Sequence, residues 1–87
     1  MKYCVDNETD SLAYCNYVAL LTKLKFGQKL KVYFNEDAMP EVLECDDEEG
    51  YLVIPERDDQ GQIVVTDSGN LQTLKLYGKV EVRIESN

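Results

Sequence analysis

Apolar side chains recur at helical spacing in the first third of the chain. Residues 9–25 contain no Gly or Pro, and at about 100° per residue the apolar positions fall on one broad face. The polar residues at 7–10 can cap a helix start, and Gly27 can adopt the left-handed conformation that ends one. The pattern predicts a helix from Thr9 or Asp10 to about Lys25, whose apolar face covers a sheet. The positions on this face are Ala13, Tyr14, Tyr17, Val18, Leu20, Leu21 and Leu24.

After Gly27 the period of the pattern changes from that of a helix to that of a strand. Leu30, Val32 and Phe34 alternate with polar or amphipathic residues, which is typical of a half-buried strand. Further short apolar runs occupy residues 42–45, 51–54, 62–66, 71–76 and 80–84, and turn-forming residues separate them at 35–40, 46–50, 58–61 and 67–70. Residues 1–5 can add a short edge strand. We therefore expect an α+β fold with one N-terminal amphipathic helix packed on a five- or six-stranded antiparallel meander, and the pattern leaves open whether the meander closes into a small barrel.

The length of 87 residues allows one domain, residues 1–87, with a thin core. The longest apolar run, residues 17–21, is far shorter than the roughly 20 residues that cross a membrane, so we expect no membrane association. The three cysteines, Cys4, Cys15 and Cys45, are an odd number without a C-x-x-C pair. They indicate free thiols that act as small buried hydrophobic residues, in a reducing compartment that we expect to be the cytoplasm.

Charge is the unusual property of this chain. Seventeen acidic and nine basic residues give a net charge of -8, and residues 36–67 contain twelve acidic residues against Arg57 alone. Phosphate backbones attract basic surfaces, so direct DNA binding is not expected. The basic side chains Lys23, Lys25, Lys29 and Lys31 lie in a segment without acids. The molecule is therefore expected to carry separate acidic and basic regions.

The residue types leave little basis for catalysis. Without histidine, Ser-His and Cys-His pairs and the common zinc sites are excluded, and no phosphate-binding glycine motif is present. Residues 56–67 place Glu56, Asp58, Gln60 and Asp67 near the offsets of a calcium loop, although the first and last ligands are atypical. An ordinary acidic hairpin loop is the alternative. We expect no enzyme activity, no cofactor and no metal.

The acidic tract is the candidate site for a partner. If Glu44, Asp46 and Glu48 were extended, their carboxylates would recur about every 6.6 Å on one side and imitate a nucleic-acid backbone. Small acidic inhibitors of nucleic-acid enzymes, often encoded by phages or mobile elements, act in this way as a class. The tract predicts a non-enzymatic protein that binds and inhibits or regulates a basic, nucleic-acid-processing partner; the alternative is that the charge serves solubility alone. The candidate partner-binding residues are Glu36, Asp37, Glu41, Glu44, Asp46, Asp47, Glu48, Glu49, Asp58 and Asp59.

A second hypothesis follows from the order of the elements. One helix followed by short strands resembles the Sm-like and SH3-like small barrels, whose signature residues this chain lacks. The resemblance implies a structural subunit or a module that binds RNA through its lysine segment. A narrow stripe of Leu12, Cys15 and Ala19 on the far side of the helix can also meet a partner or a second copy, so a homo-oligomer is a further possibility.

Overall fold

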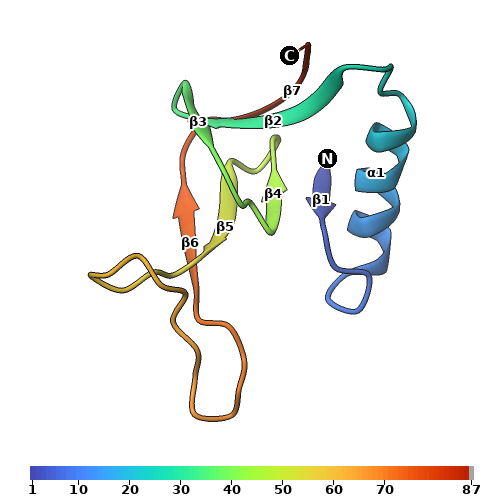
Figure 1. The fold of residues 1–87 in the computed structure, drawn as a ribbon. Helices are drawn as coiled ribbons and strands as arrows, with labels where there is room; N and C mark the ends of the chain where they lie inside the picture. Colours follow the sequence, from blue (N-terminus) through green and yellow to red (C-terminus); the bar gives the residue numbers. More distant parts are fainter. Residues whose placement is uncertain (87) are drawn as a thin grey trace.

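The computed structural model describes residues 1–86, and within them it has one helix and seven strands in two antiparallel sheets (Figure 1). The first sheet has the strand order β1-β4-β5-β6, and the second has the order β3-β2-β7. The elements are β1 (Lys2–Cys4), α1 (Ser11–Thr22), β2 (Gln28–Phe34), β3 (Asp37–Met39), β4 (Glu44–Asp46), β5 (Tyr51–Pro55), β6 (Thr73–Tyr77) and β7 (Val80–Ser86).

The helix begins where the sequence predicts. Asp10 is the N-cap residue, and its carboxylate accepts a hydrogen bond from the amide of Ala13 at 3.1 Å. The helix ends at Thr22, earlier than expected, and Gly27 with φ +82° reverses the chain into β2. Its inner side packs mainly on β1, and Ala13 is buried there.

The segment 35–40 contains a strand that the sequence analysis assigned to a turn. Asn35 and Glu36 both have positive φ, 50° and 76°, as a two-residue type I′ turn requires. This turn lets Asp37–Met39 pair with the end of β2, with Tyr33 opposite Ala38. The expectation of a plain turn was wrong because the tight reversal occupies only the first two residues.

The core lies where the two sheets meet. Leu52 on β5 has no exposed surface, and it clusters with the buried residues Cys45 and Val80. Leu52 stands opposite Cys45 on β4 and opposite Leu76 on β6, so it occupies the centre of the first sheet. Phe34 and further half-buried side chains surround this cluster. The two sheets thus share one small core.

The sheets do not close into a barrel, and the expected meander of five or six strands is only partly matched. Residues 56–72, here called the arm, project from the first sheet in Figure 1. The expected strand at 62–66 is replaced by two isolated bridges, Arg57 with Ile63 and Val65 with Leu71. Ile63, Val65 and Leu71 remain 40 to 54% exposed, because no second layer of the described chain covers them. An open arm of this kind cannot complete a barrel.

Candidate functional site

Three turns from distant parts of the chain meet at one end of the molecule. The amide of Gly78, between β6 and β7, donates to the carbonyl oxygen of Gly50 at 2.9 Å. The amide of Lys79 donates to the side-chain oxygen of Asn35 at 2.9 Å, and the Asn35 amide donates to the Lys79 carbonyl at 2.8 Å. The β2–β3, β4–β5 and β6–β7 turns are therefore joined by hydrogen bonds.

Two glycines make this close approach possible. Gly50 has φ +79°, and a Cβ atom there would lie 2.6 Å from the carbonyl oxygen of Gly78. A Cβ atom at Gly78 would lie 2.8 Å from both the side-chain oxygen of Asn35 and the ring of Phe34. Any side chain at either position would therefore push the turns apart.

Five acidic side chains project from two of these turns, and we call them the acidic end. They are exposed and lie on residues that flank the contact between Gly50, Gly78 and Asn35. Lys79 lies in the third turn and is also exposed. The structure therefore gathers acids that are up to 13 positions apart in the sequence. The acidic end consists of Glu36, Asp37, Asp47, Glu48 and Glu49.

Asp46 organises the turn that carries three of these acids. One of its carboxylate oxygens accepts the amides of Glu48 at 2.9 Å and Glu49 at 3.0 Å. The hydrogen bond from the Glu49 amide is the main reason that the pKa of Asp46 lies below its ordinary value. The amine of Met1 lies 2.7 Å from Asp47, and this hydrogen bond raises the pKa of the amine to about 10. The same amine lies 3.0 Å from Glu48. Asp46 thus has a structural role, and Asp47 and Glu48 share an ion pair with the N-terminus.

The other candidate acids are separated from the acidic end. Glu41 pairs with Arg57, which keeps the pKa of Glu41 below its ordinary value. Glu44 is half-buried and accepts a hydrogen bond from the hydroxyl of Tyr51 at 2.8 Å. Asp58 and Asp59 lie on the arm, beyond the other end of β5. The structure therefore brings together five of the ten predicted residues and uses others as internal partners.

A regular row of carboxylates does not form along Glu44, Asp46 and Glu48. Strand β4 ends at Asp46, and the chain turns over residues 47–50. The spacing of about 6.6 Å applies only to an extended strand. Any imitation of a nucleic-acid backbone must therefore come from the clustered turns.

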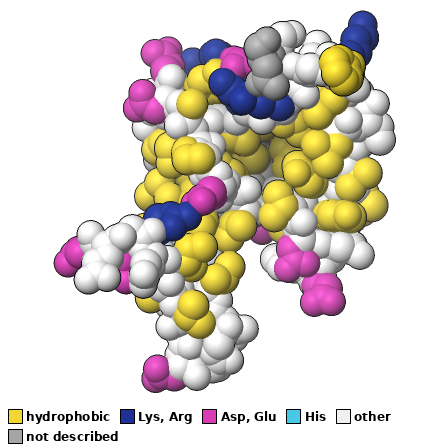
Figure 2. All heavy atoms as spheres, viewed as in Figure 1, with side chains coloured by type: hydrophobic (Ala, Val, Ile, Leu, Met, Phe, Trp, Pro, Cys, Tyr) yellow, Lys and Arg dark blue, Asp and Glu magenta, His cyan; other side chains and the backbone are white. Residues whose placement is uncertain are grey.

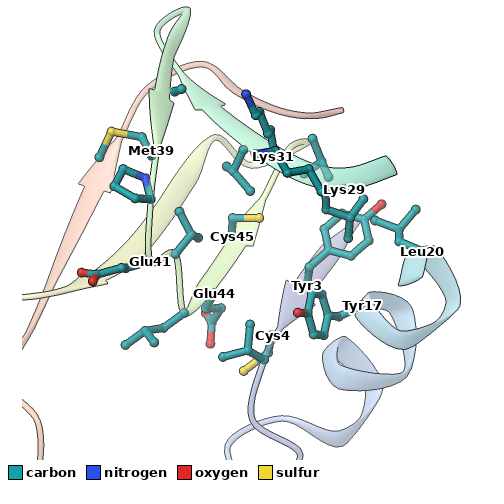
Figure 3. A pocket seen from close by; sticks show the side chains of 18 residues that line it. Tyr3, Cys4, Tyr17, Leu20, Lys29, Lys31, Met39, Glu41, Glu44 and Cys45 are labelled. Atoms are coloured by element: carbon teal, nitrogen blue, oxygen red, sulfur yellow. The ribbon is translucent and has the colours of Figure 1, made fainter. Parts of the chain in front are cut away.

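A mainly apolar hollow of about 450 Å³ lies between α1, β1, β2, β3 and β4. Figure 2 shows apolar side chains gathered in the hollowed middle of this face, with both acidic and basic side chains around its margin and on the arm. In Figure 3, Tyr3 and Tyr17 line one side of the hollow and Met39 the other, with Cys45 between them. The sequence did not indicate this hollow, because the pattern predicted that the helix covers the sheet, whereas α1 contacts β2 only weakly.

The segment considered as a calcium loop does not present a set of free oxygens. Asp58 accepts the amides of Gln60 and Gln62, both at 2.9 Å, and Arg57 donates to the carbonyl oxygen of Gly61 at 2.6 Å. A guanidinium group in the loop repels a cation. Among residues 1–86, no three His, Cys, Asp or Glu side chains come together in a way that could hold a metal ion.

The cysteines differ in their surroundings. Cys4 and Cys45 are buried as expected, and burial is the main cause that raises the pKa of Cys45 to about 12. Cys15 is exposed on the outer side of α1, so its assignment to the core was wrong. Leu12 and Ala19 are exposed on the same side. No helix in the described part of the chain is long and apolar enough to span a membrane.

Comparison of the chain with protein-family models, with curated proteins and with solved structures found no match.

Proposed function

We propose that this chain is a non-enzymatic interaction protein whose acidic end binds a basic surface of another protein and thereby inhibits or regulates it. The observation that carries the proposal is the meeting of two acidic turns across Gly50, Gly78 and Asn35. This contact brings the pair Glu36 and Asp37 beside the run 47–49, which lies ten or more positions further along the chain.

Clustered like charges create a field that steers an oppositely charged partner and increases its association rate. Such binding weakens as the salt concentration rises, because the Debye length falls to about 8 Å at physiological ionic strength. Basic grooves that bind nucleic acid attract closely spaced negative charges. A nucleic-acid-processing protein is therefore the partner class that we favour, with the carboxylates in the place of phosphates.

The surface area of the chain supports a binding role. The chain exposes 6096 Å² with a mass of 10.0 kDa. A folded monomer of this mass exposes about 5,250 Å², so the excess is roughly 850 Å². The radius of gyration, 13.6 Å, also exceeds the roughly 12 Å of a typical chain of this length. The projecting arm, with Ile63, Val65 and Leu71 exposed, contributes to this excess, so the chain leaves apolar surface available to a partner.

The hollow adds an apolar component to the proposed surface. Strand β3 begins at Asp37 in the acidic end and finishes at Met39 on the wall of the hollow. A segment whose basic residues meet the acidic end and whose apolar side chains enter the hollow, which Lys29 and Lys31 also line, would contact both regions. We propose the cytoplasm as the location, because free thiols such as Cys15 suit a reducing compartment.

The proposal is tested by affinity capture from a lysate of the cells that make the protein, with two matched double variants. Glu36→Lys/Glu49→Lys changes one residue of each acidic turn, and neither side chain has a hydrogen bond or ion pair within residues 1–86. Glu8→Lys/Asp67→Lys makes the same change in net charge far from the acidic end. We expect the wild-type chain to capture a basic protein that elutes as the salt concentration is raised. The first variant should fail to capture this protein, and the second variant should capture it as the wild type does. Equal retention by both variants would reject the acidic end as the binding surface.

A further inference from the structure

Strand β7 is a long sheet edge whose outer side pairs with no other strand of the described chain. It has seven residues without Pro or Gly. The other edges carry features that discourage pairing with a second chain. Strands β1 and β3 have three residues each, Pro40 follows β3, and Lys75 stands in the middle of β6 with its ammonium group over the ring of Tyr51. β7 is thus the longest of the edges, and its own charges, Glu81, Arg83 and Glu85, permit pairing only with a strand that places opposite charges across from them.

The backbone groups that β7 presents can be identified from its ladder with β2. Asn35 donates to the carbonyl of Lys79, and hydrogen-bonded and non-hydrogen-bonded pairs alternate along an antiparallel ladder. Glu81, Arg83 and Glu85 therefore share their backbone hydrogen bonds with β2. The N–H and C=O groups of the residues between them point away from β2, toward the free side. These outward residues are Val80, Val82 and Ile84.

The side chains of this edge are self-complementary about Val82. In an antiparallel pair of two copies centred on Val82, Val80 stands opposite Ile84 of the other copy. The same register places Glu81 opposite Arg83 and Lys79 opposite Glu85. Opposite charges directly across a strand pair are stabilising, and like charges are destabilising. Every charged residue of the edge therefore meets an opposite charge.

The neighbouring registers lack this complementarity. A pair centred on Arg83 places Arg83 opposite its own copy and Glu81 opposite Glu85. A pair centred on Glu81 places Glu81 opposite its own copy and Lys79 opposite Arg83. A shift by a single residue along one strand would put apolar side chains opposite charged ones. Of these registers, the one centred on Val82 matches both the charges and the outward backbone groups, and it pairs every residue from 79 to 85.

Three of the four charged side chains of this edge are held in place before any second copy arrives. Arg83 pairs with Glu81 on its own strand, and its guanidinium carbon lies 4.3 Å from the centre of the Tyr33 ring. The Tyr33 hydroxyl donates to Glu85 at 2.6 Å, and Lys31 lies 3.4 Å from the same carboxylate. Little side-chain entropy is then lost on pairing.

We propose that the occupant of this edge is a second copy of the chain, which forms a two-fold symmetric dimer by antiparallel pairing of β7 about Val82. Each copy adds three strands, in the order β3-β2-β7, to one continuous sheet. The dimer is isologous, so each contact occurs twice. The acidic ends lie outside the pairing strands, and the dimer presents two of them. This proposal does not depend on the proposed function.

Two single variants test the register by charge. Arg83→Glu places Glu opposite Glu81, and Glu81→Arg places Arg opposite Arg83, each twice per dimer. We expect either variant alone to dimerise about 10- to 100-fold more weakly than the wild type. An equimolar mixture restores opposite charges at both positions, so it is expected to form a heterodimer about as stable as the wild-type dimer.

Sedimentation velocity at increasing concentrations, with a reducing agent to exclude disulfides through Cys15, measures these equilibria. Circular dichroism shows whether each variant folds. Formation of the heterodimer in the mixture is independent evidence that both variants are folded. A wild-type chain that stays monomeric up to about 0.5 mM would overturn the proposal. A wild-type dimer that both single variants retain, or single variants whose mixture stays monomeric, would overturn pairing through β7 about Val82.

Discussion

Replacement of Leu52 by Ala is expected to remove a large part of the stability of the fold. Leu52 has no exposed surface and lies between Cys45 and Leu76 in the middle of the first sheet. Truncation of a fully buried Leu to Ala costs about 3 to 5 kcal/mol, because apolar burial is lost and a cavity remains. A chain of 87 residues has a total stability of very roughly 4 to 13 kcal/mol. Leu52→Ala should therefore destabilise the fold severely.

Guanidinium unfolding followed by tyrosine fluorescence and circular dichroism measures this loss. All variants are compared at one protein concentration, because dimerisation would make the midpoint depend on concentration. Leu12→Ala is the matched control, since Leu12 is 79% exposed on the outer side of α1 and its truncation should change the stability by less than about 0.5 kcal/mol. A loss below about 1 kcal/mol in Leu52→Ala would contradict the position of the core.

Three further predictions concern the turns and the thiols. Gly50→Ala should destabilise by about 2 kcal/mol or more, because its Cβ would strike Gly78, whereas Gly61→Ala, with a similar φ and open space, should cost about 1 kcal/mol in the same unfolding assay. The pKa of Asp46 in the folded state lies below its ordinary value of 3.8. Its contribution to the free energy of unfolding is therefore present above pH 3.8 and is lost as the pH falls through the folded-state pKa. Below about pH 5, the unfolding midpoint should fall less steeply with pH in Asp46→Asn than in the wild type. A thiol reagent should modify Cys15 in the native protein at once, and Cys45 only after denaturant is added.

The elements with local signals could be predicted from the sequence. Asp10 marked the start of the helix, and the period of two marked β2 and β7. The N-terminal strand was also expected at an edge, where β1 lies. Capping and alternation depend on residues within one turn or strand, so the sequence contains them directly.

Features that depend on contacts between distant segments could not be predicted. Strand β3 follows a type I′ turn made by Asn35 and Glu36, without the Gly that usually marks such turns. The run at 62–66 has strand-forming residues, but within residues 1–86 it forms only isolated bridges with the neighbouring segments of the arm and no continuous strand. Propensity alone cannot say whether a strand finds a partner.

The candidate site shows the same limit. The partner-binding residues were predicted from the density of acidic residues alone. That prediction included Glu41 and Glu44, whose carboxylates contact Arg57 and Tyr51 within the fold. The acidic end depends on the approach of Gly50 to Gly78, two residues 28 positions apart. No local pattern reports such a contact, although a Gly in each of two turns is consistent with one.

The location of the partner on the surface is the central claim, and backbone amide chemical shifts measure it most directly. The isotope-labelled chain is titrated with the protein recovered by affinity capture, and the amide shifts of residues 1–86 are followed. We expect the largest changes at residues 36–37 and 47–49, with smaller ones along β3 toward the hollow. Changes confined to the arm or to the outer side of α1, with the acidic end unaffected, would contradict the account.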